Sequence, residues 1–189
     1  MALRLQTVIC STRPGRIGPS MAQWFDRFAE QEGSFETEIV DLAEFSFPVF
    51  DEPNHPRLGQ YENDHTKRWS QTVDRADAFV FVTPEYNHGP SPSLLNALTY
   101  LSREWNYKPA GFVSYGGIAG GVRAVQETKS TLVTLKMFPL VVEGVIVPMV
   151  QTMLDDDKVF HPNEMMEKGA DAMLKELHRV SEALKGLRT

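Results

Sequence analysis

The chain carries its clearest structural signal in Ala78-Phe79-Val80-Phe81-Val82, which runs directly into Thr83-Pro84-Glu85-Tyr86-Asn87-His88-Gly89. A nearly unbroken apolar run is typical of a central parallel strand that is covered on both faces. The proline and the polar residues that follow predict a turn at the end of the strand. Because open parallel sheets bind ligands beyond the carboxyl ends of their strands, this turn is expected to face a ligand.

Two other stretches repeat this arrangement. Residues 3–10 predict a first strand, and Ser11-Thr12-Arg13-Pro14-Gly15-Arg16-Ile17-Gly18 follows it. Residues 110–114 predict a fourth strand, which leads into Ser114-Tyr115-Gly116-Gly117. Three polar, glycine-containing loops at three strand ends are therefore expected to meet around one ligand.

The remaining segments alternate between helix and strand. We predict helices at 21–31, 62–75, 94–102, 122–136 and 162–187, with further strands at 37–42 and 140–147. Such alternation indicates an α/β fold, a parallel sheet with helices on both faces. Right-handed crossovers restrict the sheet to a doubly wound topology.

The segment Ala43–Gln60 contains Pro48, Pro53 and Pro56, and so predicts a loop. It is long for a connector, which suggests a lid or an interface. The sequence shows neither an internal repeat nor a domain boundary. Residues 1–189 are therefore expected to form a single domain.

The overall composition narrows the class of protein. The chain has 189 residues, 42% of them hydrophobic, and a net charge of −6. This acidic balance argues against nucleic acid as a partner. The lone Cys10 cannot form an internal disulfide, and no apolar run is long enough to span a membrane. We therefore expect a soluble cytoplasmic protein with neither a nucleic-acid nor a membrane partner.

The loop at residues 11–18 has the composition of an anion site. Arg13 and Arg16 can form charge-assisted hydrogen bonds with phosphate oxygens, and Gly15 and Gly18 allow close approach of the backbone. The helix that follows favours an anion at its start. The Walker and dinucleotide-binding patterns are both absent. An ordinary strand-to-helix turn with two surface arginines remains the alternative.

The other two loops are better suited to a flat polar ring. Tyr86 can flank an aromatic ligand, and Asn87 can form hydrogen bonds with a heterocycle. Gly116 and Gly117 would bring backbone N–H groups close to a ring edge. Taken singly, each loop could be a common proline-containing or glycine-containing turn, so the joint placement of the loops carries the prediction.

The motifs together resemble those of the NAD(P)H-dependent FMN reductase family, a flavodoxin-like group that includes quinone, azo-dye and chromate reductases. The resemblance covers nearly the whole chain. It rests on the first loop, on 83–87, on Leu94-Leu95-Asn96-Ala97, and on Lys108-Pro109 with 114–117. It implies a five-stranded sheet of order 2-1-3-4-5 with the ligand between the first and third strands.

The resemblance also implies the cofactor and the residues that hold it. The FMN phosphate would be bound by Ser11, Arg13, Arg16, Ile17 and Gly18. The isoalloxazine would be lined by Pro84, Glu85, Tyr86, Asn87, Ser114, Tyr115, Gly116 and Gly117. Members of the family often have serine at the position of Arg16 and asparagine at that of Gly18, so this chain departs from the pattern at both positions.

The predicted activity is an FMN-dependent NAD(P)H oxidoreductase. NADPH or NADH would give a hydride to the flavin N5 atom, and the oxidised nicotinamide would then leave. A small-molecule acceptor such as a quinone, a flavin or an azo compound would take its place and receive the hydride, which is ping-pong exchange. Because the cofactor carries the chemistry, no catalytic side chain and no metal site is predicted. His88 is better explained as an exposed turn residue than as a proton donor.

Two alternatives stay open at this point. One is a flavodoxin-type electron carrier that docks with protein partners, although its phosphate loop would not usually hold two arginines. The other is a binding protein of the same fold without a flavin. The resemblance further implies a homodimer or a homotetramer.

Overall fold

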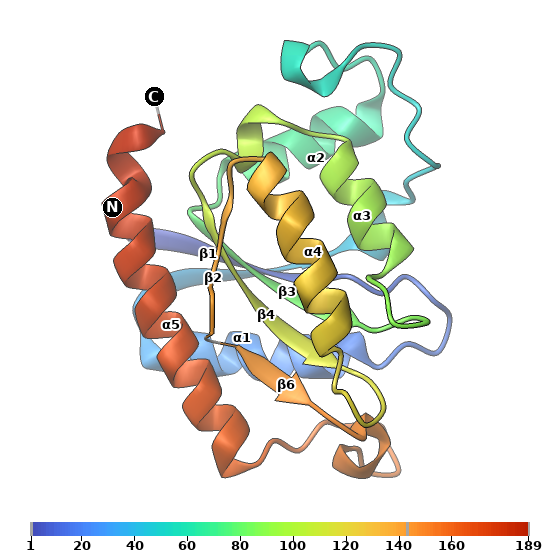
Figure 1. Cartoon of the computed structure of the whole chain (residues 1–189), viewed down its shortest axis with the longest axis vertical. Helices are drawn as coiled ribbons and strands as arrows, with labels where there is room; N and C mark the ends of the chain where they lie inside the picture. The colour runs from blue at the N-terminus through green and yellow to red at the C-terminus, as the bar shows by residue number, and fades with distance from the viewer. Residues whose placement is uncertain (1, 143, 189) are drawn as a thin grey trace.

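The computed structural model describes residues 2–142 and 144–188 and forms a parallel sheet between two layers of helices (Figure 1). The strands are β1 (Leu3–Ile9), β2 (Phe35–Asp41), β3 (Ala78–Pro84), β4 (Pro109–Tyr115), β5 (Phe138–Pro139) and β6 (Val145–Val147). Their order is β2-β1-β3-β4-β5, and β6 also pairs with β4. The α/β class and the predicted 2-1-3-4-5 order are confirmed.

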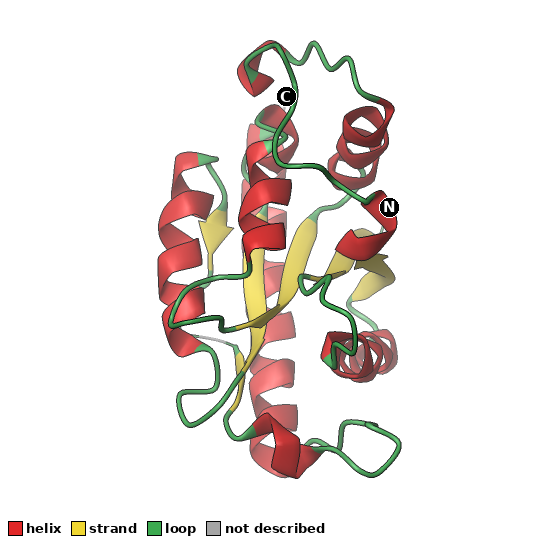
Figure 2. Cartoon of the chain, turned by 90° about the vertical axis from the view of Figure 1, so that its right-hand side faces the viewer, coloured by secondary structure: helices red, strands yellow, loops and turns green. Residues whose placement is uncertain are grey.

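Among the described residues, five α-helices cover the sheet. Figure 2 shows the strands between the helices. The helices are α1 (Gly18–Glu32), α2 (Asp64–Asp74), α3 (Pro92–Thr99), α4 (Val122–Thr134) and α5 (Glu164–Leu184). Helices α1 and α5 share one apolar core, whereas α2, α3 and α4 share the other. Within the described ranges, none of these helices combines the length and apolar character needed to cross a membrane.

The burial of the central strand β3 accounts for its apolar sequence. All seven of its residues are buried. Val80 and Val82 enter the core beneath α1 and α5, while Phe79 and Phe81 enter the opposite core. Successive side chains of a strand point to opposite faces, so a strand buried on both sides needs apolar residues at nearly every position.

The predicted fifth strand at 140–147 is wrong in its extent, and the sheet formed by residues 2–142 and 144–188 has six strands rather than five. Phe138 pairs with Pro109, and Val145 pairs with Val113. Between these two paired regions, β4 has two residues, whereas the segment that joins β5 to β6 has five. The three extra residues cannot pair in register with β4. Val141 and Val142 lie outside both strands and are 83% and 84% exposed. Residue 143, also within that prediction, lies outside the described residues.

The segment at residues 43–60 is an ordered strap rather than a free loop. It contains the short 3-10 helix η2 (Pro56–Leu58), and a similar turn, η1 (Leu42–Phe45), overlaps its start. The ring of Phe47 stacks on that of Tyr100, with 4.8 Å between the ring centroids. The Asn96 side chain donates to the Pro48 carbonyl at 2.7 Å and accepts from the Phe50 amide at 3.0 Å.

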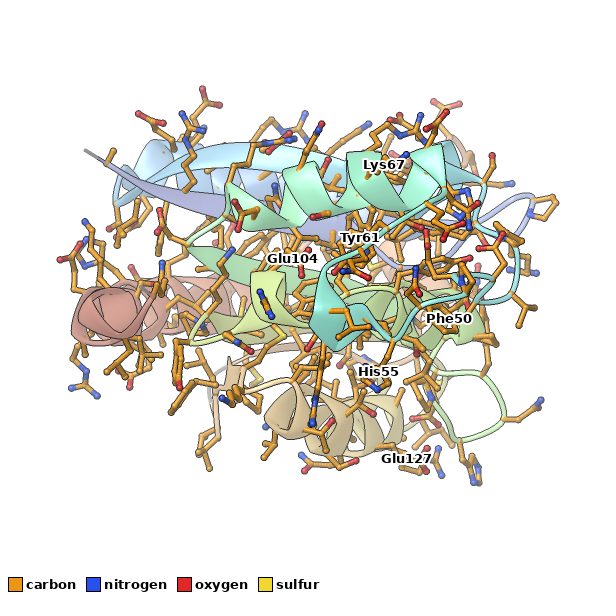
Figure 3. All side chains as sticks on the ribbon, turned by 90° about the horizontal axis from the view of Figure 1, so that it is seen from above. Phe50, His55, Tyr61, Lys67, Glu104 and Glu127 are labelled. Carbon is orange, nitrogen blue, oxygen red and sulfur yellow. The ribbon has the colours of Figure 1, made fainter. Side chains whose placement is uncertain are left out.

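The far end of this strap lies over α3 and α4, away from the carboxyl ends of the central strands. Figure 3 shows Phe50 and His55 on it, and Tyr61 pointing toward Glu104, which accepts a hydrogen bond from the Tyr61 hydroxyl at 3.1 Å. A second cavity separates the strap from Leu98 of α3 and Thr131 of α4. No residue of 43–60 lines the crevice at the carboxyl ends of the central strands. The structure therefore does not support the predicted role of this segment as a lid.

Lys108 is an unusual buried cation at the start of β4. It is 5% exposed, and its Nζ donates to the Val73 and Asp74 carbonyls at the end of α2 at 2.8 and 2.9 Å. Burial lowers the pKa of Lys108 to about 8, against about 10.4 for a free lysine. Between these two values the unfolded chain binds more protons than the folded one, so the stability contributed by this site rises with pH.

We therefore predict that Lys108→Met removes a component of the pH dependence of stability. Between about pH 8 and 10, the free energy of unfolding of the parent should rise relative to that of the variant by up to about 1.4 kcal/mol per pH unit. Urea denaturation at several pH values measures this difference. Parallel pH profiles for the two proteins would show that Lys108 is charged in the folded state throughout this range.

Candidate cofactor site

A crevice of about 270 Å³ opens at the carboxyl ends of the central strands. It is lined by Ser11, Arg13, Arg16, Ile17, Pro84, Glu85, Tyr86, Tyr115, Gly116, Gly117, Met149, Val150 and Gln151. Ten of these are among the thirteen residues predicted to hold a ligand. Residues from the loops after β1, β3 and β4 thus come together in one place, because the three strands are neighbours in the sheet.

Three predicted residues lie just outside this lining. Gly18 is the buried first residue of α1, and a Cβ atom there would lie 3.0 Å from the Tyr115 hydroxyl. Ser114 is buried and donates to the Gly120 carbonyl at 2.8 Å, which holds the loop after β4. Asn87 is exposed in a tight turn with φ of 50°, next to His88 with φ of 71°. Gly18 and Ser114 therefore shape the crevice from behind.

Three residues of the crevice were missed by sequence reasoning: Met149, Val150 and Gln151. They follow β6, and backbone bonds tie them to the loop after β4. The Met149 amide donates to the Gly117 carbonyl at 2.8 Å, and the Val150 amide donates to the Gly116 carbonyl at 3.1 Å. The strand-end rule could have identified them, since they too follow a strand that pairs with β4.

Two tyrosines join the loops at the base of the crevice. The Tyr86 hydroxyl lies 2.8 Å from Ser11 Oγ, which links the turn after β3 to the loop after β1. Tyr115 is buried at the end of β4, and burial raises the pKa of Tyr115 above its ordinary value. Tyr115 therefore presents a neutral hydroxyl, and both side chains present apolar rings.

The end of the crevice at the first loop is suited to an anion. Arg13 is exposed, and no carboxylate of the described residues lies within ion-pair distance of it. The amides of Thr12, Arg13 and Gly15 donate to no backbone carbonyl within residues 2–142 and 144–188. Helix α1 starts at Gly18 with no side-chain cap and no acid in its first turn. Unpaired donors, a helix start and a guanidinium together favour a negatively charged group.

The second predicted cation, Arg16, is already paired. Its two terminal nitrogens donate to the two carboxylate oxygens of Asp41 at 2.5 Å each, and Nη1 also donates to the Ser11 carbonyl at 2.7 Å. Asp41 is the last residue of β2. The bond to Asp41 raises the pKa of Arg16 further above its already high value. Arg16 lines the crevice, but in this structure its guanidinium is held by the protein.

Glu85 forms part of the opposite wall, and its charge is compensated. Its carboxylate accepts from Arg123 Nε at 2.9 Å and from the Arg123 amide at 3.2 Å, in the first turn of α4. Burial raises the pKa of Glu85, but these bonds outweigh that effect and leave it below its ordinary value. The carboxylate therefore stabilises the start of α4, and the crevice has an anion-binding end without a repelling acid opposite.

The residues identify the kind of ligand that fits. The first loop offers positive charge, free amides and the apolar side chain of Ile17, whereas the other loops present Tyr86 and Val150 beside the backbone of Gly116 and Gly117. Within the described part of the chain, no group of histidine, cysteine and acidic residues could hold a metal ion. A molecule with an anionic group and a flat ring fits both ends.

Comparison with known proteins agrees with this geometry. The family model described as NADPH-dependent FMN reductase matches residues 3–152. An NAD(P)H-dependent FMN reductase of Schizosaccharomyces pombe is 42% identical over 125 residues, which are 65% of this chain and 62% of that protein. The NAD(P)H-dependent FMN reductase LOT6 of Saccharomyces cerevisiae is 31% identical over 146 residues, 71% of this chain and 76% of that one.

The fold is also shared with solved structures. The flavoenzyme FerB of Paracoccus denitrificans, an NAD(P)H:(acceptor) oxidoreductase, superposes with a TM-score of 0.76. The match covers 96% of this chain and 98% of FerB at 17% identity, which establishes likeness of fold alone. The family model spans most of the chain and includes every predicted loop. This chain belongs to the NADPH-dependent FMN reductase family.

Proposed function

We propose that this protein is an FMN-dependent NAD(P)H oxidoreductase that binds its flavin in the strand-end crevice. The observation that carries the proposal is that one crevice combines an arginine without an ion-pair partner, in the loop that leads into α1, with an apolar slot edged by backbone groups. Family membership supports the same conclusion. The matched region covers 62% of the S. pombe relative. The activity of that whole protein is therefore proposed for this chain on the basis of the crevice and the family.

The residues present fit FMN. Its phosphate would lie at the first loop, within reach of Arg13 and of the amides of Thr12 and Gly15. Its ring would lie between Tyr86 and the loop at Gly116 and Gly117. The crevice has one anion-binding end and no dinucleotide fingerprint, which favours FMN over FAD.

The protein's own contribution is position and electrostatics. Bound FMN supplies hydride transfer between the nicotinamide and an acceptor. The Gly117 N–H group would stabilise negative charge on a reduced ring, as donors aimed at developing charge do, whereas the Gly116 N–H donates to the Val147 carbonyl at 3.3 Å. The ring of Tyr86 would orient a flat substrate. Glu85 is held by Arg123 and Tyr115 is buried, so neither of these side chains is placed to move a proton.

One open flavin face would have to serve donor and acceptor in turn. We therefore predict parallel double-reciprocal lines for initial rates at several acceptor concentrations, with inhibition at high acceptor. Removing the Tyr86 ring in Tyr86→Ala should change the KM of both substrates. Tyr86→Phe is the matched control, because it removes only the hydroxyl that contacts Ser11. Intersecting lines and a trapped ternary complex would contradict the shared face.

The acceptor, the assembly and the cellular location belong to the proposal. A quinone, a flavin or an azo compound would suit an apolar slot, and a two-fold homodimer would cover the open side of the crevice. Light scattering tests the assembly, and a mass of 21.3 kDa with full activity would refute the dimer. A reducing, cytoplasmic location rests on the lone Cys10, which is buried and free.

A further inference from the structure

The ion pair between Arg16 and Asp41 connects the first loop to the edge of the sheet. Arg16 lies in the middle of that loop, and Asp41 ends β2, the neighbour of β1. The two side chains are 21% and 14% exposed and form two parallel bonds of 2.5 Å. A bidentate, largely buried pair of this kind fixes geometry as well as charge.

Further bonds extend this pair into a network. Arg16 Nη1 donates to the Ser11 carbonyl, so one guanidinium closes the loop on its own first residue. The Arg16 amide donates to the Arg13 carbonyl at 3.2 Å. Asp41 Oδ1 also accepts from the Ala43 amide at 3.0 Å, at the start of the strap. The network therefore determines the shape of the loop that carries Arg13.

The pairing also decides how much positive charge the crevice offers. The charge of Arg16 is compensated by Asp41 at contact distance, whereas Arg13 has no such partner in the described chain. A phosphate at the first loop would meet one uncompensated guanidinium rather than two. Arg13 and Arg16 are therefore not equivalent, although they stand three residues apart in the same loop.

We propose that Arg16 and Asp41 form a clasp that holds the first loop in its anion-binding shape, with Arg16 a positioning residue and Arg13 the phosphate ligand. The inference rests on the proposed FMN site. It gives a structural role to Arg16, whose guanidinium is already paired. It also adds Asp41, a carboxylate near an anion site, to the residues on which binding depends.

The clasp and a direct phosphate contact predict opposite signs for one substitution. Asp41→Asn removes a negative charge near the phosphate and frees the Arg16 guanidinium. If Arg16 were a phosphate ligand, FMN should bind as tightly or more tightly. If the pair is a clasp, the loop loses its anchor and FMN should bind more weakly, because binding must then order the loop.

The experiment is a fluorescence titration of the apoprotein with FMN and with riboflavin, which lacks the phosphate. It uses the parent, Asp41→Asn, Arg16→Gln and the double variant, with circular dichroism to show that each is folded. We expect each single variant to weaken FMN binding roughly tenfold, the order expected for a lost charged hydrogen bond. The double variant should be no weaker than either single variant, since both remove one clasp.

The ratio of FMN to riboflavin affinity separates a positioned phosphate loop from general damage. That ratio should fall in the clasp variants, because riboflavin lacks the group that the loop recognises. Asp171→Asn on α5 is the matched control, as it removes an aspartate from an exposed ion pair elsewhere. Arg16→Lys adds a second variant. It keeps the charge but not the two parallel bonds, so it should behave like Arg16→Gln.

Two results would overturn the clasp. One is unchanged or tighter FMN binding by Asp41→Asn. The other is retained affinity in Arg16→Lys together with a large loss in Arg16→Gln, which is the pattern of a direct charge contact. If substitution at one of the two positions prevents folding, the variant at the other position still separates a clasp from a direct contact. Failure of the parent itself to bind FMN would instead refute the proposed function.

Discussion

Gly121→Ala is expected to lower the free energy of unfolding by about 2–5 kcal/mol. Gly121 has φ of 86°, where a non-glycine residue costs about 1–2 kcal/mol. A Cβ atom at this position would lie 2.8 Å from the Tyr115 amide nitrogen and 2.9 Å from Ser114 Cβ. Overpacking against backbone that cannot yield adds about 1–3 kcal/mol.

The substitution should also displace residues of the cofactor site, because residues 116–121 connect the crevice to α4. Gly117→Ala is the matched control for stability, since its φ is not positive and a Cβ there would meet nothing within 4 Å. Urea denaturation of the two apoproteins measures the difference. Equal stabilities would mean that the loop relaxes around the added methyl group and does not fold tightly against the end of β4.

Arg13→Ala is expected to weaken FMN binding by roughly 1.5–3 kcal/mol, the usual contribution of a hydrogen bond to a charged group. This corresponds to about a tenfold to more than a hundredfold loss of affinity. Arg13 lines the crevice and has no carboxylate partner in the described chain, so its loss leaves the phosphate without its guanidinium. The visible spectrum of bound flavin should change little, because the ring is held by the other loops.

A fluorescence titration measures this effect, and Arg27→Ala provides the control. Arg27 is an exposed arginine on α1 that does not line the crevice. Its substitution changes the net charge of the protein by the same amount as Arg13→Ala. Equal FMN affinities for the two variants would remove Arg13 from the site. Riboflavin should bind both equally, since it has no phosphate.

Much of the fold could be predicted because its signals are local. The apolar run at β3 is typical of a strand buried on both faces, and neighbouring parallel strands bring the loops at their carboxyl ends together. Ten predicted site residues share the crevice for this reason. That they bind FMN, and that the chain folds as one domain, stay predictions.

The features that the sequence did not reveal depend on pairings between distant residues. Nothing near Arg16 in the sequence indicates that Asp41 will hold its guanidinium, because the two meet only when β1 and β2 pair. The interruption between β5 and β6 has the same origin. An apolar run at 140–147 predicts a strand, but the register with β4 shows that three of the residues cannot be accommodated.

The most direct test of the central claim is anaerobic mixing of the FMN-loaded protein with NADPH and with NADH, followed by the absorbance of the flavin. We predict that the flavin bleaches in a single turnover with at least one nicotinamide and recovers when a quinone is added. Flavin released by heating should be FMN on chromatography. A flavin that stays oxidised with both donors, as expected of an electron carrier that uses no nicotinamide, would contradict the proposed oxidoreductase activity.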